Sequence, residues 1–224
     1  MELASRQSPP DSLANLHAVV PVKRLERAKS RLAAVLAPAE RRLLVLEMLG
    51  RVLATLCRSP LAAIWVVSGD PLVLAQASRY GARPLREREG ELNSALEHAR
   101  AVAIAAGADA LLIVPADVPL LRADDVRGML GLLRAGADVA LAPDDAGLGT
   151  NALALRATAG LPFSFGEESA LRHMGLAAER GLVARRFASP TLELDVDDPV
   201  SLARYRALAL PPPLAPCVLC PPGP

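Results

Sequence analysis

The fold is decided by ALLIVPAD, residues Ala110–Asp117, where an uninterrupted apolar run leads directly into Pro-Ala-Asp. A short run of this kind is typical of a strand that is buried on both faces of a parallel sheet. Two further runs have the same character, LHAVVPV at Leu16–Val22 and AAIWVV at Ala62–Val67. Because helical segments separate these runs, we predict an α/β protein, a Rossmann-like three-layer sandwich with a mostly parallel central sheet.

Helices are expected where apolar residues recur at helical spacing between start and stop signals such as Pro, Asp and Gly. The predicted helices are Pro38–Cys57, Pro71–Tyr80, Asn93–Ala106, Asp124–Arg134, Glu167–Arg180 and Pro199–Leu208. Further strands are predicted at Arg83–Arg86, Asp138–Ala142 and Asn151–Arg156, and an extended segment is predicted at Leu192–Val196.

The composition excludes several classes of function. The chain has 224 residues and a formal net charge of +1, and aromatic residues make up only 3%. A nearly neutral chain with few aromatic rings is poorly suited to nucleic acid, through phosphates or through stacked bases. No apolar run approaches the roughly 18 to 20 residues that span a bilayer, and the N-terminal segment lacks the apolar core of a signal peptide.

One domain is expected over residues 16–209, between a flexible N-terminal tail (1–15) and a Pro-rich C-terminal tail (210–224). Three cysteines in a chain of this length indicate a reducing compartment, so we expect a cytoplasmic protein. Cys217 and Cys220 form a C-x-x-C pair in the tail, but a zinc site needs about four ligands and no second pair exists. The role of this pair is left open.

The loop after the first predicted strand, Lys23–Arg31, carries five cations and no glycine. It therefore matches neither the dinucleotide-binding fingerprint nor the Walker phosphate loop. Lys23 and Lys29 are the only lysines among 25 basic residues, and an ammonium is a compact charge that suits phosphate. A solvated cationic surface is the alternative, but the position at a strand end favours triphosphate binding.

Aspartates occupy two other positions where metal ligands are expected. Asp117 follows the best predicted strand and lies between two prolines, although a turn or helix cap is the plainer explanation. Asp195 and Asp197 alternate along an extended segment, so their side chains point to the same side. Asp198 is the expected cap of the last helix. Two carboxylates on one side repel unless a cation lies between them, and Mg²⁺ prefers such oxygen ligands.

An aspartate cluster that faces a cationic loop predicts phosphoryl or nucleotidyl transfer with Mg²⁺. Such a reaction on a phosphate acceptor needs no general base, because a phosphate monoester has its second pKa near about 6. The three histidines, His17, His98 and His173, lie far apart along the chain and mark no triad. His173 is interpreted as a polar surface residue or as a residue that supports the site.

Five segments then occur in one order: VPVKRLERAKSRL (Val20–Leu32), PADVPLL (Pro115–Leu121), GLGTNAL (Gly147–Leu153), FGEESALRH (Phe165–His173) and LELDVDDP (Leu192–Pro199). Together they resemble the 2-phospho-L-lactate or phosphoenolpyruvate guanylyltransferases of coenzyme F420 biosynthesis. The resemblance extends over Ala18–Leu208. It implies a fold of the nucleotide-diphosphosugar-transferase type.

The resemblance also implies a role for each matching position. Metal binding falls on Asp117, Asp195 and Asp197, and catalysis on Asp117 and Lys23. GTP binding falls on Lys23, Lys29, Arg31, Leu92, Asn93 and Asp117, and acceptor binding on Thr150, Gly166 and Ser169. From the residues alone, these last three could equally serve a turn or the start of a helix. Glu91 stands where the family usually has glycine, which leaves the guanine contact open.

The function implied by the resemblance is transfer of a guanylyl group from GTP to a phosphorylated three-carbon acid, phosphoenolpyruvate or 2-phospho-L-lactate, with release of pyrophosphate. Alternatives are 3-phosphoglycerate as acceptor, a cytidylyltransferase, a molybdopterin-type guanylyltransferase, or a nucleotide-binding protein without catalysis. The expected partners are GTP and the acid, with no nucleic acid and no membrane. A homodimer stays open.

Overall fold

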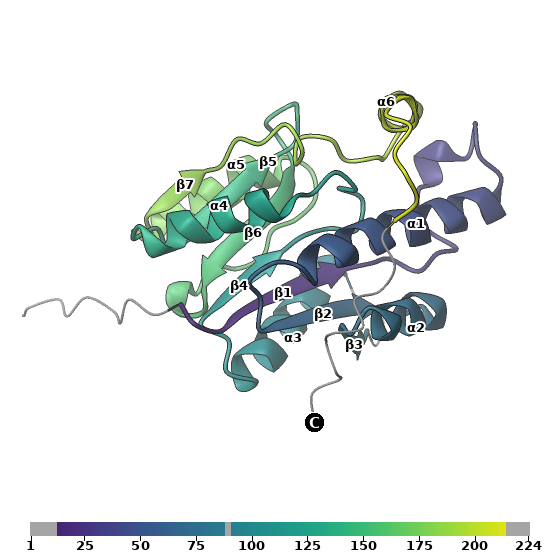
Figure 1. Ribbon diagram of the computed structural model, residues 1–224. Coiled ribbons are helices and arrows are strands. Elements are labelled where there is room, and N and C mark those ends of the chain that lie inside the picture. The colour runs from purple at the N-terminus through teal and green to yellow at the C-terminus, as the bar shows by residue number, and fades with distance from the viewer. Residues whose placement is uncertain (1–12, 88–90, 214–224) are drawn as a thin grey trace, which may run out of the picture.

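The computed structural model describes residues 13–87 and 91–213 of the chain (Figure 1). The predicted tails fall largely on residues outside these ranges, and so do Cys217 and Cys220. Within the described part, a single sheet of seven strands has the order β3-β2-β1-β4-β6-β5-β7. The strands are β1 (Leu16–Pro21), β2 (Ala63–Ser68), β3 (Arg83–Arg86), β4 (Ala110–Ile113), β5 (Val139–Pro143), β6 (Thr150–Arg156) and β7 (Ala184–Arg186).

The direction of the strands brings distant segments to one edge of the sheet. β1 pairs in parallel with β2 and with β4, while β6 runs antiparallel to β4 and β5. Leu153 of β6 pairs with Ile113 at the end of β4. The amino end of β6, at Thr150, therefore lies at the edge where β1 and β4 have their carboxyl ends. Ligands of open α/β sheets bind at this edge.

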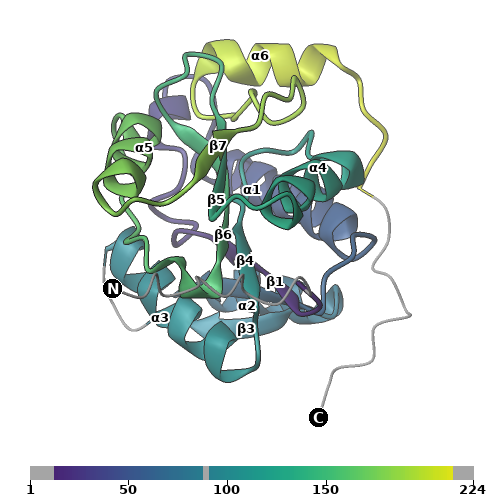
Figure 2. The same cartoon turned by 90° about the vertical axis from the view of Figure 1, so that its left-hand side faces the viewer.

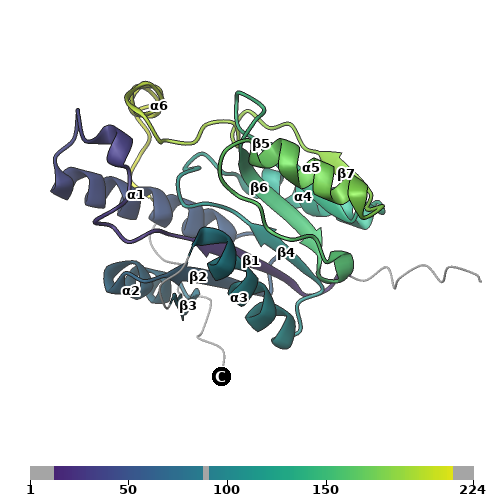
Figure 3. The same ribbon diagram turned by 180° about the vertical axis from the view of Figure 1, so that it is seen from behind.

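Helices cover both faces of the sheet. The helices are α1 (Pro38–Leu56), α2 (Pro71–Arg79), α3 (Leu92–Ala105), α4 (Ala123–Arg134), α5 (Ser169–Glu179) and α6 (Pro199–Ala207), with short 3-10 turns η1 (Ser30–Leu32) and η2 (Ala157–Ala159). α1 and α4 lie in front of the sheet in Figure 1, and α3 and α5 lie on its other face in Figure 3. Figure 2 shows the resulting layers side by side.

Alternate residues of each central strand pack into different cores, as the two-residue period of a strand requires. Ala18 and Val20 of β1 pack with α1 on one face, whereas Val19 packs with Leu96 of α3 on the other. Both cores are dominated by Leu, Val, Ala and Ile, which explains why the central strands read as continuous apolar runs. Among the described helices, none is long and apolar enough to cross a membrane.

The sequence predicts most elements to within two residues, and the α/β fold with a mostly parallel sheet is confirmed. The structure differs from the prediction at two places. The edge strand β7 was not predicted, because its residues Ala-Arg-Arg carry no apolar signal. The extended segment predicted over Leu192–Val196 is wrong at its start, where Leu192 lies in a turn and Glu193 in a bend, because the amides of both residues donate to the carbonyl oxygen of Ser189.

The segment that leads to Asp195 is tied down at both ends. Before it, the buried carboxylate of Asp125 on α4 accepts from the Ser189 hydroxyl at 2.5 Å and from the Thr191 hydroxyl at 2.6 Å. After it, the Val196 amide donates to the carbonyl oxygen of Asp117 at 2.9 Å. These bonds hold the segment that carries Asp195 and Asp197 against the loop that carries Asp117.

We predict that Asp125→Ala lowers the free energy of unfolding by about 2 to 4 kcal/mol, because the buried Ser189 hydroxyl, the partly buried Thr191 hydroxyl and the amide at the start of α4 lose their acceptor. The neighbouring Asp124 is the matched control, since its side chain is 82% exposed and pairs only with Arg127 within the described residues. Asp124→Ala should change stability by less than about 0.5 kcal/mol. Urea unfolding monitored by circular dichroism measures both, and equal effects would contradict the anchoring role.

Candidate active site

A cleft of about 630 Å³ opens at the carboxyl edge of β1 and β4. With the exception of Asn93, every site residue predicted from the sequence lines it. These residues are Lys23, Lys29, Arg31, Leu92, Asp117, Thr150, Gly166, Ser169, Asp195 and Asp197. Segments that are far apart in the chain thus meet in one place.

The cationic loop after β1 is held by the neighbouring strand and its turn. The Val22 amide donates to the Val67 carbonyl at 2.9 Å, and the Leu25 amide donates to the Asp70 carboxylate at 3.1 Å. Asp70 also caps α2 through the Leu72 amide. The guanidinium of Arg24 packs against Gly69, where an added Cβ would meet its Nε at 2.9 Å. Asp70 is a supporting residue that the sequence motifs did not reveal.

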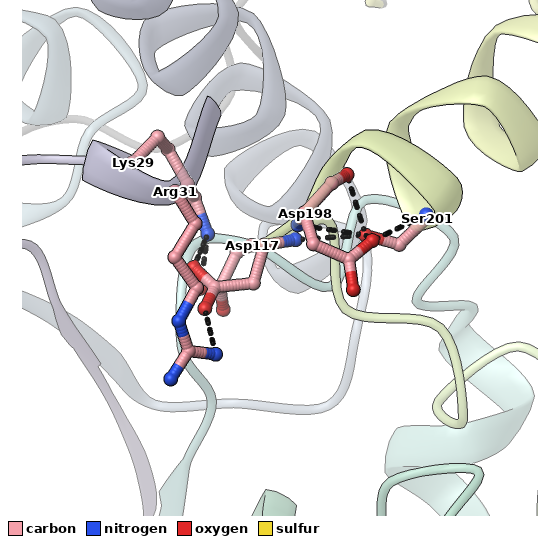
Figure 4. Close-up of polar contacts among 6 residues, drawn as sticks. Lys29, Arg31, Asp117, Asp198 and Ser201 are labelled. Carbon is pink, nitrogen blue, oxygen red and sulfur yellow. Dashed lines mark hydrogen bonds and ion pairs between the residues drawn. The ribbon is translucent and has the colours of Figure 1, made fainter. Parts of the chain in front are cut away.

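Lys29 joins the loop to two aspartates (Figure 4). Its ammonium lies 2.6 Å from Oδ2 of Asp117 and 3.3 Å from Oδ1 of Asp197, and its side chain is only 7% exposed. Burial alone lowers the pKa of Lys29, but the carboxylates of Asp117 and Asp197 outweigh it and raise the pKa above its ordinary value. The backbone of Lys29 is left-handed, with φ 55°, a conformation that non-glycine residues adopt uncommonly.

Arg31 adds a second cation on the open side of the cluster, with its Nη1 3.0 Å from Oδ2 of Asp197. Asp198 turns the other way and accepts from the Ser201 amide as the cap of α6 (Figure 4), as predicted. Asp197 therefore does not merely begin the helix, because its side chain faces Lys29 and Arg31.

Asp195 lies half-buried in the same cleft. Burial, followed by the nearby carboxylate of Asp117, raises its pKa, and the Asn151 side chain and Lys29 offset part of the rise. A buried carboxyl group whose pKa is raised by a neighbouring carboxylate is a favourable place for a cation.

The donor set of this cluster fits Mg²⁺ in kind. Asp117, Asp195 and Asp197 offer carboxylate oxygens, which Mg²⁺ prefers, and it is usually held by one or two carboxylates together with substrate phosphates. In the described part of the chain, no three His, Cys, Asp or Glu side chains form a ready cage for a metal ion. The ammonium of Lys29 lies between two of the three candidate ligands.

The opposite side of the cleft is formed by hydroxyl groups and a tight turn. Thr150 and Ser169 are both buried, and Gly166 has φ 126°, which a side chain would strain. The hydroxyl of Thr150 lies 3.1 Å from Nδ1 of His173, whose Nε2 accepts from the Ser164 amide at 2.9 Å. The interpretation of His173 as a surface residue is wrong, because its exposure is 0%.

Asn93 supports the cleft from behind. Its Oδ1 accepts from the Phe165 amide at 2.8 Å and its Nδ2 donates to the Phe165 carbonyl at 3.2 Å. This pairing clamps the turn that carries Gly166 to the start of α3. Direct binding of GTP by Asn93 stays a prediction. Asn151, which the sequence predicts only as the start of a strand, donates from its side-chain amide to the Leu192 carbonyl at 2.8 Å.

The fold belongs to a known structural class. The chain superposes on a crystal structure described as a putative nucleotide-diphospho-sugar transferase from Desulfovibrio desulfuricans G20 with a TM-score of 0.71, at 19% identity, covering 86% of this chain and 87% of that one. At this identity the likeness shows the fold alone, an α/β sandwich of the nucleotide-diphospho-sugar-transferase type.

The particular family follows from sequence. Residues 16–205 match the family model described as "Guanylyl transferase CofC like". A protein from Chloroflexus aggregans named phosphoenolpyruvate guanylyltransferase is 45% identical over 86% of this chain and 97% of its own length. One of the same name from Rubrobacter xylanophilus is 46% identical over 86% of this chain and 94% of its own. The chain belongs to the CofC-like guanylyl transferase family and is a nucleotidyltransferase.

The buried His173 gives a testable pH dependence. Burial, and then the neighbouring Arg172 cation, lowers its pKa from 6.5 to about 4. The folded state thus binds this proton less tightly than the unfolded state. Stability from neutral His173 is complete above about pH 6.5 and is lost as the pH falls toward about 4.

We predict that wild-type protein loses about 2 kcal/mol more of its unfolding free energy between pH 7.5 and pH 5 than His173→Phe does. The exposed His98 provides the control, and His98→Phe should follow the wild type. Urea unfolding at both pH values measures the difference, and parallel losses in wild type and His173→Phe would contradict the lowered pKa.

Proposed function

We propose that this protein transfers the guanylyl group of GTP to phosphoenolpyruvate and releases pyrophosphate, a step of coenzyme F420 biosynthesis. Membership of the CofC-like family and the printed names of the relatives from Chloroflexus and Rubrobacter support this acceptor. 2-Phospho-L-lactate is the second candidate, because it is the other acceptor implied by the five segments of sequence. Both acids carry the phosphate group that the reaction requires.

The observation that carries the proposal is the charge distribution in the cleft. Exposed Lys23 and Arg31 line the same cleft as Asp117, Asp195 and Asp197. GTP and phosphoenolpyruvate are both polyanions, so their encounter is opposed by repulsion in the absence of cations. A cleft lined by cations and by carboxylates able to recruit Mg²⁺ can offset this repulsion.

The reaction balances without a proton transfer from the protein. A phosphate oxygen of the acceptor forms a bond to the α-phosphorus of GTP. The bond from that phosphorus to the oxygen that bridges the α- and β-phosphates breaks. Pyrophosphate leaves with the electron pair. The acceptor phosphate is largely a dianion near neutral pH, and in the described part of the chain no histidine lines the cleft.

The residues of this chain have distinct tasks in that reaction. Lys23 and Arg31 hold the triphosphate and neutralise charge that builds on the leaving pyrophosphate. Lys29 fixes the relative positions of Asp117 and Asp197. Asp117 and Asp195 would hold Mg²⁺ together with phosphate oxygens, and Asp197 would complete or support that set. When bound, Mg²⁺ supplies charge neutralisation and in-line orientation of the phosphates.

The acceptor binds at the hydroxyl side of the cleft. Thr150 and Ser169 offer hydroxyl donors, and the dipole of α5, which begins there, favours an anion. It acts against the carboxylates of Glu167 and Glu168, which also line the cleft and must turn away from the acceptor. Leu92 lines the same cleft and provides an apolar contact for the guanine ring.

The decisive experiment incubates the protein with GTP, Mg²⁺ and each of phosphoenolpyruvate, 2-phospho-L-lactate and 3-phosphoglycerate, with mass spectrometry of the products. A parallel measurement of pyrophosphate release with CTP, ATP and UTP tests whether the enzyme prefers guanine over the other nucleobases. We expect a guanylylated phosphoenolpyruvate as the main product. Preference for CTP, or no product with any acceptor, would contradict the proposal.

We predict that Asp117→Asn lowers kcat by at least about two orders of magnitude, because the loss of one carboxylate weakens charge neutralisation at the phosphates. The fold should persist, since the backbone bond from Val196 to Asp117 remains and Lys29 keeps Asp197. Near-normal Mg²⁺-dependent turnover of this variant, with an unchanged thermal melting temperature, would contradict the metal assignment.

Lys23 and Arg24 are adjacent cations with different surroundings. Lys23 lines the cleft, whereas the Arg24 side chain packs against Gly69. We predict that Lys23→Met raises the KM for GTP about tenfold or more and that Arg24→Met changes it less than about threefold. Steady-state kinetics with varied GTP measures both. Small and equal effects would support a merely solvated cationic loop.

A further inference from the structure

His173 connects two walls of the acceptor side of the cleft. It lies on α5, is completely buried, and contacts both Thr150 at the start of β6 and Ser164 in the loop before α5. Its ring also packs edge-on against Phe165, with 4.9 Å between ring centroids. His173 is thus enclosed, and among the described residues Thr150 is the cleft residue whose side chain hydrogen-bonds to it.

The two contacts determine which ring nitrogen carries the proton. The Ser164 amide can only donate, so Nε2 of His173 must accept and cannot carry a hydrogen. A neutral imidazole has one N–H, which must then be on Nδ1. Nδ1 therefore donates to the hydroxyl oxygen of Thr150, 3.1 Å away. A backbone hydrogen bond with Ser169 also acts on this ring and raises its pKa, the direction expected where a ring N–H meets an acceptor.

This assignment has a consequence for the hydroxyl of Thr150. Its oxygen accepts from His173, so its own hydrogen is not used in that bond. Thr150 lines the cleft, and among the described residues its hydroxyl makes no second hydrogen bond. The hydroxyl hydrogen is therefore available to an anionic group inside the cleft.

We propose that His173 is a positioning residue that fixes the Thr150 hydroxyl as a hydrogen-bond donor to the anionic acceptor. The proposal rests on the proposed function, because it names a determinant of acceptor binding in the same cleft. A doubly protonated ring would set an Nε2–H against the Ser164 amide, which also donates. The lowered pKa of His173 agrees with a ring that stays neutral under ordinary conditions.

The proposal predicts a selective effect on the acceptor. His173→Phe keeps an aromatic ring against Phe165 and removes both polar contacts, so KM for the acceptor should rise about tenfold. KM for GTP should stay within about twofold, because the cations of the GTP side are untouched. His173→Asn should recover most of the loss, since its amide nitrogen can take the position of Nδ1.

A double-mutant cycle separates positioning from mere packing. Thr150→Val should raise the acceptor KM to a similar extent, and His173→Phe should add little in the Thr150→Val background. A structural role would instead add its effect in both backgrounds and would alter KM for GTP as well. Additive effects, or an acceptor KM unchanged in His173→Phe, would overturn the proposal.

The tautomer provides a readout that does not depend on turnover. Nitrogen-15 spectra of wild-type protein at pH 7 should show a protonated Nδ1 and an unprotonated Nε2 for His173, identified by its loss in His173→Phe. A protonated Nε2 would overturn the proposal even in an active enzyme. If the wild type transferred the guanylyl group to none of the acceptors, the proposed function would be wrong. The nitrogen-15 spectra would then still test the hydrogen bond from His173 to Thr150.

Discussion

The ammonium of Lys29 between the carboxylates of Asp117 and Asp197 is the interaction on which the geometry of the cleft depends. It joins positions separated by 88 and 168 residues along the chain. A cation that is only 7% exposed is stable there because two carboxylates outweigh its loss of hydration. The left-handed backbone at Lys29 is retained in the same way, since the surrounding contacts determine its conformation. Local strain and buried charge therefore coincide at the point where the cationic loop meets the aspartates.

The two sides of the cleft act through different interactions, charge attraction on one and hydrogen bonds on the other. Each kind suits a different part of the proposed reaction. On the charged side, Lys23, Arg31 and the aspartates act over several ångströms and tolerate small displacements of a flexible triphosphate. On the hydroxyl side, Thr150 and Ser169 act only at hydrogen-bond distance, so their positions must be fixed more closely. The structure supplies that rigidity through buried groups behind the surface, His173 behind Thr150 and Asn93 behind the Gly166 turn. Selection among small acids is thus expected to depend on residues that touch no ligand.

The sequence predicts those features of the structure that leave a periodic or compositional pattern along the chain. The strand at Ala110–Ile113 is apolar because both of its faces are buried, and the aspartate at its end is exposed to the cleft because the sheet edge lies there. Residues that act through a contact with a distant segment of the chain leave no such pattern, so their roles cannot be predicted. Nothing in the sequence around Asn93 shows that its amide pairs with the backbone of Phe165, and nothing around Asp70 shows that it holds the Leu25 amide. The strand β7 was missed for a related reason, because an edge strand with arginines at two of three positions has neither apolar alternation nor a buried face.

The burial of His173 also bears on the chemistry that the site can support. A histidine that serves as general base needs an accessible nitrogen and a pKa near the working pH, and His173 has neither, since both of its nitrogens are engaged and burial lowers its pKa to about 4. The acceptor of the proposed reaction does not require such a base, because its phosphate is deprotonated near neutral pH without assistance. With the enzyme contributing no titrating base, the lower limit of the pH–rate profile for acceptor use should reflect the second ionisation of the acceptor phosphate. The same ring that would be a poor base is, as a fixed neutral donor, well suited to hold a hydroxyl in one orientation.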